Sequence, residues 1–160
     1  MVRGGIKSGE SVLIHDGSET IGIASIRIAL KMGCKVFTFV NTKEKKDFLE
    51  RIFPELADGC IGHVSTFDEM VLKETNGCGV DLVFGYATGE HLEASLNCLT
   101  HGGRFLKIGN FDFPKKSVLK MKNISLYGIV FDAQFRSEVS IKRKIWRLVD
   151  EGTVYLVANK

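Results

Sequence analysis

Residues 11–22 read Ser11-Val12-Leu13-Ile14-His15-Asp16-Gly17-Ser18-Glu19-Thr20-Ile21-Gly22. The first five residues are an apolar run typical of a buried strand, and Asp16-Gly17-Ser18 is a turn sequence. From about residue 19 to 32 the spacing predicts a helix with one apolar face, formed by Ile21, Ala24, Ile28 and Met32, and ended by Gly33. The chain therefore opens with a strand, a tight turn and a helix, and the turn has the pattern G-x-x-x-x-G.

The same rhythm continues along the chain. Further strands are predicted at 35–40, 60–62, 80–84, 104–108, 124–131 and 154–157, and helices at 43–52, 66–76 (opened by a capping box from Thr66 to Glu69), 89–99 and 140–151. Alternating strands and helices form parallel βαβ units. The sequence thus predicts an α/β fold, a Rossmann-type doubly wound parallel sheet of about six strands, in one domain over residues 1–160. Such sheets bind ligands beyond the carboxyl ends of their strands, so functional residues are expected just after positions 15, 40, 84 and 108.

Charge and composition exclude several classes of function. The chain has 22 Lys and Arg against 19 Asp and Glu, a net charge of +3, which is too mild to indicate a nucleic-acid partner. The four cysteines form no Cys-x-x-Cys pair and no His pair has metal-ligand spacing, so we expect small buried thiols in a reducing compartment and no metal site. No apolar run approaches the roughly 18 residues of a membrane span, and there is no apolar signal segment. These features predict a cytoplasmic protein that has no membrane partner.

The glycine turn is typical of a dinucleotide site. In such a site Gly17 would serve the tight turn and Gly22 the close packing of the helix, and the intervening residues Ser18, Glu19, Thr20 and Ile21 would face the pyrophosphate. The alternative is a plain strand-to-helix turn in which the glycines serve geometry alone.

The second strand indicates which dinucleotide would bind. An NAD site usually has Asp or Glu about 20 residues after the glycines, but this strand runs into Asn41 and Thr42, followed by Lys45 and Lys46. Lysines suit a 2′-phosphate, so NADP(H) is favoured over NAD. The missing acid also argues against an S-adenosylmethionine methyltransferase. The alternative is that the two lysines merely begin an exposed helix.

With these segments assigned, the chain resembles the enoyl reductase domain of animal fatty acid synthase, a medium-chain reductase-like module. The resemblance is collinear over nearly all 160 residues, and its matching segments are 9–15, 17–18, 28–30, 33–37, 44–46, 53–56, 79–83, 92–95, 98–99, 103–106, 108–109, 111–112 and 131–133. It implies NADPH-dependent reduction of a 2-enoyl thioester carried on an acyl carrier protein. It adds Tyr86 and Gly109 to the candidate cofactor-binding residues.

The resemblance also implies a larger assembly. The family's GroES-like substrate domain is absent from these residues, so we expect the 160 residues alone to turn over no enoyl thioester. Family members are homodimers that pair through the nucleotide-binding sheet, and the candidate pairing edge is the strand 124–131.

Three departures from the family pattern bear on function. Glu19 and Thr20 replace two central glycines. Repulsion between the Glu19 carboxylate and a phosphate about 5 Å away would cost roughly 3 kcal/mol of binding free energy at an effective dielectric near 20. In the first turn of the helix, the same carboxylate would instead interact favourably with the helix dipole. In the family, a lysine and an aspartate together are proposed to supply the proton. Asn110 stands at the position of that lysine. Asp132 matches the aspartate and is the candidate acid, and the alternative is that it is a plain exposed loop residue. Gly85-Tyr86-Ala87 also replaces Asn-Ser-Leu. These departures leave open a second function, a non-catalytic scaffold or interaction domain of the same origin.

Overall fold

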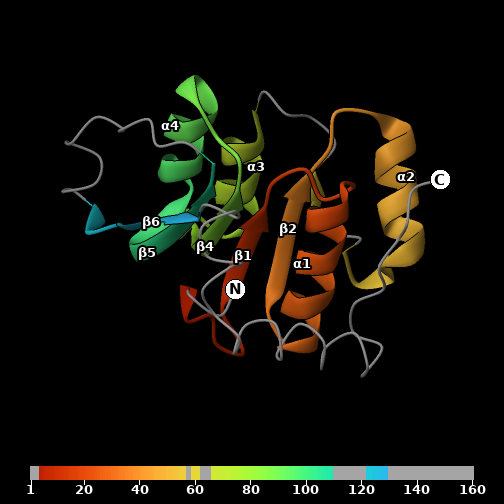
Figure 1. The fold of residues 1–160 in the computed structure, drawn as a ribbon, viewed down its shortest axis with the longest axis horizontal. Coiled ribbons are helices and arrows are strands. Elements are labelled where there is room, and N and C mark those ends of the chain that lie inside the picture. Colours follow the sequence, from red (N-terminus) through yellow and green to blue (C-terminus); the bar gives the residue numbers. More distant parts are fainter. Residues whose placement is uncertain (1–3, 57–58, 62–65, 110–121, 130–160) are drawn as a thin grey trace.

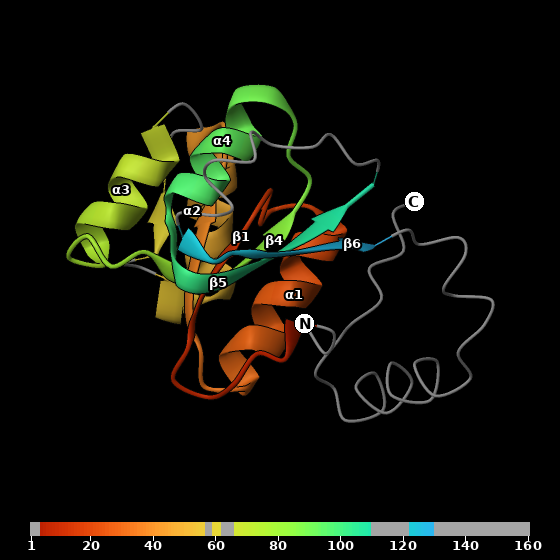
Figure 2. The same ribbon diagram turned by 90° about the vertical axis from the view of Figure 1, so that its left-hand side faces the viewer.

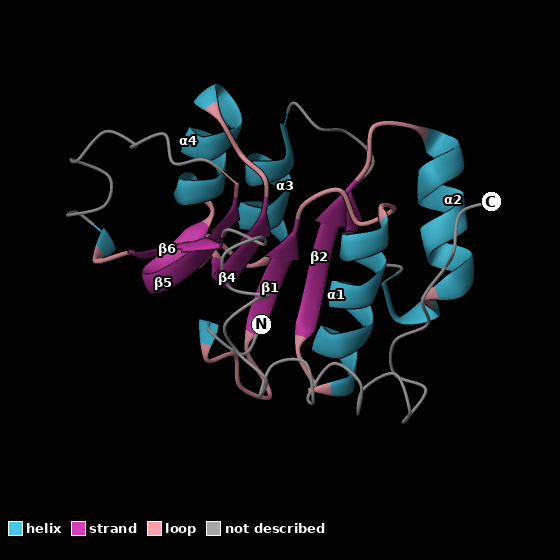
Figure 3. Cartoon of the chain, in the orientation of Figure 1, coloured by secondary structure: helices cyan, strands magenta, loops and turns pink. Residues whose placement is uncertain are grey.

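The predicted α/β fold is confirmed by a computed structural model, which describes residues 4–56, 59–61, 66–109 and 122–129. Six strands form one sheet in the order β3-β2-β1-β4-β5-β6, and every neighbouring pair is parallel. Helices connect the strands and cover the sheet (Figure 1; Figure 3 separates helices from strands by colour). This is a Rossmann-type doubly wound architecture.

The elements follow the sequence rhythm closely. The strands are β1 (Ser11–Ile14), β2 (Lys35–Phe39), β3 (Cys60–Ile61), β4 (Val80–Gly85), β5 (Leu99–Ile108) and β6 (Ser125–Ile129). The helices are α1 (Thr20–Lys31), α2 (Lys43–Ile52), the short 3-10 helix η2 (Pro54–Leu56), α3 (Phe67–Glu74) and α4 (Gly89–Asn97). The predicted helix 140–151 and strand 154–157 lie outside the described residues.

Two apolar layers hold the sheet. On one face Ile26, Ala29 and Leu49 of α1 and α2 pack against Val12, Ile14, Val36, Leu82 and Leu106. On the other face Phe67, Val71, Leu92 and Leu96 of α3 and α4 pack against Leu13, Phe37, Val83 and Phe105. Figure 2 shows α1 on one side of the sheet and α3 and α4 on the other. Because successive strand residues point to opposite faces, each inner strand serves both layers.

The strand order sets the position of a ligand site. β1 lies between β2 and β4, so the chain leaves β1 toward one half of the sheet and later returns to the other half. The connections therefore diverge at the carboxyl end of β1, which is where ligands of such sheets bind.

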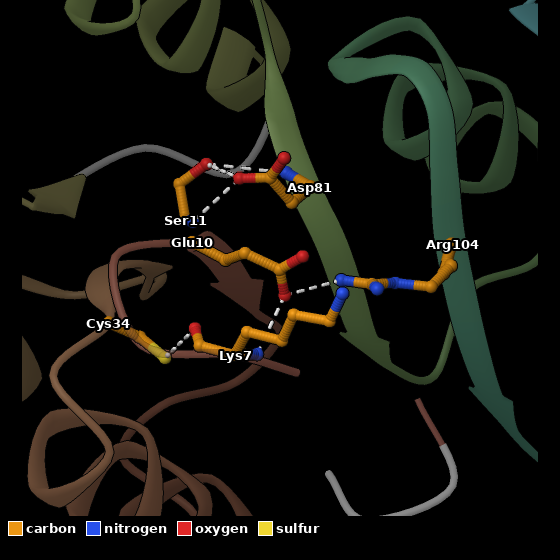
Figure 4. A network of polar contacts seen from close by, with 6 residues as sticks. All are labelled: Lys7, Glu10, Ser11, Cys34, Asp81 and Arg104. Carbon is orange, nitrogen blue, oxygen red and sulfur yellow. Dashed lines mark hydrogen bonds and ion pairs between the residues drawn. The ribbon is translucent and has the colours of Figure 1, made fainter. Parts of the chain in front are cut away.

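The opposite edge of the sheet carries a polar network instead (Figure 4). The carboxylate of Asp81 accepts hydrogen bonds from the Ser11 backbone N–H at 2.8 Å and the Ser11 hydroxyl at 2.9 Å. The guanidinium of Arg104 donates to Glu10 at 2.7 Å. These contacts join the amino ends of β1 and β4 to each other and the residue before β1 to the middle of β5.

The apolar face of α1 differs from the prediction. Its buried residues are Gly22, Ser25, Ile26 and Ala29, whereas Ile21 and Met32 are each 37% exposed. The small residues face the sheet because they let the helix axis approach closely, and the larger predicted face is turned away from the core. The prediction of this face was therefore wrong, although the helix itself begins and ends within one residue of the predicted bounds.

β5 begins five residues earlier than predicted. Residues 101–103, between the predicted helix 89–99 and the predicted strand 104–108, belong to the strand, and Val80 pairs with Leu99 and Leu82 with Arg104. Three extra residues thus bulge out of β5 between these pairs. Gly102 has a φ of +77°, which allows the chain to leave and rejoin the ladder.

The start of α3, the cysteines and the lengths of the helices bear on three further expectations. Thr66 is the N-cap of α3, but its side chain makes no capping hydrogen bond, so the predicted capping box is not formed. Cys34 and Cys98 are buried as expected, whereas Cys78 is exposed. In the part of the chain that the structure describes, no helix combines the length and apolar character needed to cross a membrane.

Candidate functional site at the carboxyl end of the sheet

The turn after β1 is compact because its glycines touch backbone and side chains. A β-carbon at Gly22 would collide with the Asp16 carbonyl oxygen, and one at Gly17 would collide with the Thr38 hydroxyl. Asp16 adopts a φ of +48°, and its carbonyl accepts the Glu19 N–H at 2.9 Å. Both glycines are therefore required by the turn itself, whatever binds there.

A hollow of about 370 Å³ opens beside this turn. It is lined by His15, Asp16, Glu19, Thr20, Ile21, Gly22, Phe84, Gly85, Tyr86 and Ile108. These residues follow or end β1, β4 and β5, so the strand ends meet where the sequence rhythm predicted. The exposure of Ile21 has its explanation here, because its side chain forms part of the wall of the hollow.

A second hollow of about 500 Å³ lies on the β2 side of the first. It is lined by Asp16, Phe39, Asn41, Tyr86, Ala87, Thr88 and His91. Asp16 and Tyr86 line both hollows, so the two form one elongated cleft across the carboxyl ends of β2, β1 and β4. An elongated cleft at this place has the form that a dinucleotide requires.

The cleft is acidic around the turn. Asp16 and Glu19 line the first hollow, and none of its ten lining residues is Lys or Arg. Glu19 is the N-cap of α1, but its side chain makes no capping hydrogen bond. The carboxylate instead pairs with the Lys45 ammonium group across the cleft edge, at 3.1 Å between Oε1 and Nζ. Glu19 therefore lies just before the first turn of α1 and not in it as expected, and its carboxylate forms an ion pair with another segment.

The other polar residues after β2 have distinct environments. Thr42 is the N-cap of α2, and its hydroxyl accepts the Lys45 N–H at 3.3 Å. Lys46 pairs with Glu50 on the same helix at 3.4 Å. Only Asn41 of this group lines the second hollow. The two lysines therefore differ: Lys45 reaches toward the glycine turn, and Lys46 stabilises its own helix.

His15 is a polar residue of the site that the sequence reasoning missed. Its ring is 4% exposed, and Nδ1 lies 2.6 Å from the Tyr86 carbonyl oxygen while Nε2 lies 3.1 Å from the Ser95 hydroxyl. Burial lowers the pKa of His15 to about 4, against a smaller raising effect of the Tyr86 carbonyl. A neutral ring facing a carbonyl must carry its proton on Nδ1, so His15 donates to Tyr86 and fixes that residue at the cleft.

The predicted site residues thus fall into three groups. Glu19, Thr20, Ile21, Gly22, Asn41 and Tyr86 line the cleft. Gly17, Ser18, Thr42, Lys45, Lys46 and Gly109 are not among the lining residues; Gly109, with a φ of +88°, lies beside the Tyr86 ring. Asn110 and Asp132 lie outside the described residues, so their predicted roles stay predictions.

The missed residues share one property. His15, Phe39, Phe84 and Ile108 lie at or just after strand ends, and His91 lies in the first turn of α4, all without any motif of their own. The only signal in the sequence is their position at strand ends. Apolar residues there look like core until the cleft is seen.

The sequence of this chain is similar to a known family and to segments of polyketide synthases. Residues 20–148 match the family described as zinc-binding dehydrogenases. The highly reducing polyketide synthase apmlA of Arthrinium phaeospermum is 35% identical over 123 residues, which is 76% of this chain and 5% of that protein. The highly reducing polyketide synthase AN6791 of Emericella nidulans is 33% identical over 159 residues, 93% of this chain and 6% of that protein. The chain therefore spans about one twentieth of the length of these relatives.

The fold is similar to those of solved enoyl reductase structures. The CurK enoyl reductase superposes with a TM-score of 0.82 and 25% identity, covering 97% of this chain and 48% of that one. The nucleotide-binding subdomain of the enoylreductase domain of PpsC from Mycobacterium tuberculosis superposes with a TM-score of 0.80 and 25% identity, covering 96% of this chain and 89% of that one.

The family description includes zinc, and the donors for it can be tested here. Among residues 4–56, 59–61, 66–109 and 122–129, no three His, Cys, Asp or Glu side chains come together as a metal site would require. The described residues therefore do not fit a zinc ion.

Proposed function

This chain belongs to the zinc-binding dehydrogenase family, and on that premise we propose that it is the NADPH-binding half of an enoyl reductase module. Its class is that of the nucleotide-binding domains of enoyl reductases. The relatives named above are polyketide synthases. We therefore propose a module that reduces enoyl thioesters on the acyl carrier of such a multienzyme, rather than one tied to fatty acid synthesis.

One observation carries this proposal: the elongated cleft lies beside the Gly17–Gly22 turn at the strand order's point of reversal. The N-terminus of α1 points its free backbone N–H groups toward the pyrophosphate position. In this proposal Asn41 and Tyr86, which line the second hollow, contact the adenosine half, and Lys45 contacts a 2′-phosphate. NADPH, when bound, supplies a hydride for the β-carbon of the enoyl group.

The chain's own residues position rather than react, as far as they are described. His15 holds the Tyr86 carbonyl, and Ile21 and Phe84 supply apolar wall beside the turn. Asp132 as acid and Asn110 as a hydrogen-bond donor to the thioester remain part of the proposal. The pairing of two copies through β6 is also part of the proposal, since β6 has a neighbouring strand on one side only in the described sheet.

A fluorescence titration with NADPH tests the proposal, using two matched variants. Ile21→Glu adds a carboxylate to the cleft wall, whereas Met70→Glu adds one at a similarly exposed position on α3; Ile21 is 37% and Met70 40% exposed. We expect saturable binding to the unchanged chain, at least a ~10-fold loss in Ile21→Glu from like-charge repulsion, and no loss in Met70→Glu. Absence of binding up to roughly millimolar NADPH, or equal losses in both variants, would contradict the proposal.

The acids of the cleft favour a second candidate function. Asp16 and Glu19 disfavour a phosphate at the turn that would hold it. A non-catalytic scaffold domain of the same origin binds no phosphate there, so these two carboxylates would not impair its function. The same titration separates the two functions, because the scaffold predicts no saturable binding in any of the three proteins.

A further inference from the structure

Glu19 and Lys45 connect two parts of the cleft that would hold different phosphates. Glu19 lies at the turn after β1, where the pyrophosphate is proposed to bind, and Lys45 lies in the first turn of α2, where a 2′-phosphate is proposed to bind. Their side chains meet at 3.1 Å and are 65% and 40% exposed, respectively. Each residue is thus both a partner of the other and a candidate contact of the ligand.

We infer that Glu19 competes with the 2′-phosphate for Lys45 and thereby sets how strongly the cleft distinguishes NADPH from NADH. This inference rests on the proposed function, because it concerns two dinucleotides in the same cleft. It makes Glu19 a specificity-determining residue.

The competition acts differently on the two ligands. NADH has no 2′-phosphate, so the ion pair can persist and the Lys45 charge partly offsets the repulsion between Glu19 and the pyrophosphate. NADPH needs Lys45 for its additional phosphate, so the ion pair must part. Glu19 is then left without its cation beside a ligand that carries more negative charge. The carboxylate therefore weakens NADPH binding more than NADH binding.

Lys46 does not replace Lys45 in this role. Its ammonium group pairs with Glu50, one turn further along α2, at 3.4 Å. The Lys45 backbone N–H is in addition bound by the Thr42 hydroxyl, so Lys45, which does not itself line the hollows, is held beside the glycine turn by Glu19.

The expected effect is moderate because both side chains are exposed. An exposed ion pair changes an equilibrium by up to about fivefold, and the repulsion left by an unpaired Glu19 adds to this. Removing the Glu19 charge should therefore raise the ratio Kd(NADH)/Kd(NADPH) about three- to tenfold.

Titration of both dinucleotides against five proteins tests the inference at low ionic strength. The proteins are the unchanged chain, Glu19→Gln, Lys45→Gln and the double variant, with Glu69→Gln as a control that removes an exposed carboxylate from the first turn of α3. We expect the ratio to rise in Glu19→Gln, to stay constant in Glu69→Gln, and to show no Glu19 effect in the Lys45→Gln background.

Each outcome has a distinct meaning. If Glu19→Gln tightens both ligands equally, Glu19 acts on the pyrophosphate alone and the inference is wrong while the proposed function stands. If the ratio rises equally without Lys45, competition for Lys45 is refuted. If neither dinucleotide binds any of the proteins, the proposed function fails and the inference fails with it. Circular dichroism of each variant shows that the fold is retained.

Discussion

At the scale of single residues, His15 is a buried polar ring surrounded by aromatic side chains. The rings of Phe39, Phe67 and Phe105 lie 4.9, 5.9 and 5.9 Å from its ring centroid. The Ser95 hydroxyl beside Nε2 also lies 2.6 Å from the His91 carbonyl oxygen, and it has one proton to give. An imidazolium would satisfy every one of these contacts, but burial makes the charge too costly, so the ring is neutral at neutral pH.

This buried ring predicts a loss of stability in mild acid. The pKa of His15 is lowered from 6.5 to about 4 in the folded chain. Below pH 6.5 the unfolded chain gains a proton that the folded chain does not, so the free energy of unfolding falls as the pH falls toward 4. Between pH 7 and pH 5 this group alone removes about 2 kcal/mol.

Urea denaturation of the chain and of His15→Asn measures this effect. Asparagine keeps an N–H near the Nδ1 position but has no group that titrates in this range. The unchanged chain should lose about 2 kcal/mol more than the variant between pH 7 and pH 5, since all other groups contribute equally to both. Parallel pH dependences would show that His15 titrates near its ordinary pKa.

Residue positions were predictable where their cause is local. Gly17 and Gly22 were assigned from a turn that needs glycines for its own packing, and the structure shows the contacts that exclude a β-carbon. The ion pair between Glu19 and Lys45 spans 26 residues, and the contact between His15 and Ser95 spans 80. Such pairs depend on how the elements pack together, which hydrophobic periodicity does not encode.

At the scale of elements, the order and type of the described helices and strands were predictable, whereas the buried face of α1 and the start of β5 were not. Periodicity finds a helix, but the face that meets a flat sheet is chosen by small residues, here Gly22, Ser25 and Ala29. The bulge in β5 depends on the register with β4, and a glycine pair in the sequence is equally compatible with a turn.

The end of α4 illustrates an element stabilised from a distance. The ammonium group of Lys122, just before β6, donates to the carbonyl oxygens of Leu96, Asn97 and Leu99, the last at 2.9 Å. The last carbonyls of a helix have no partner within the helix and carry partial negative charge, so a lysine there satisfies them and complements the dipole.

Replacing Lys122 should therefore weaken the end of α4. Lys122→Met keeps the aliphatic part of the side chain and removes the donor, and we expect a loss of about 1–2 kcal/mol in the free energy of unfolding. Lys73→Met in the last turn of α3, where the lysine is exposed, is the matched control and should change stability by less than about 0.5 kcal/mol. Equal losses in the two variants would mean that the carbonyl contacts contribute nothing specific.

At the scale of the whole molecule, the two edges of the sheet have different chemistry. The carboxyl edge is open, with a cleft whose first hollow is lined by Asp16 and Glu19 and by no Lys or Arg. The amino edge is closed by paired groups: Asp81 with Ser11, and Arg104 with Glu10 (Figure 4). This division assigns stability to one edge and binding to the other, and it follows from the parallel topology, which gathers all strand ends of one kind on one side.

The division predicts that stability and binding can be changed separately. Asp81→Ala leaves the Ser11 N–H and hydroxyl without their acceptor, and we expect a loss of about 2 kcal/mol in the free energy of unfolding, with NADPH affinity unchanged within about twofold because the cleft residues are untouched. Asp81→Asn retains one acceptor oxygen and should lose about half as much.

Ile21→Glu should behave in the opposite way, with weakened NADPH binding and nearly unchanged stability, because its side chain is already in contact with water. Denaturation curves and NADPH titrations on the same three variants decide the matter: a proportional loss of both properties in Asp81→Ala would mean that the amino edge also shapes the cleft, and that the sheet transmits strain between its two ends.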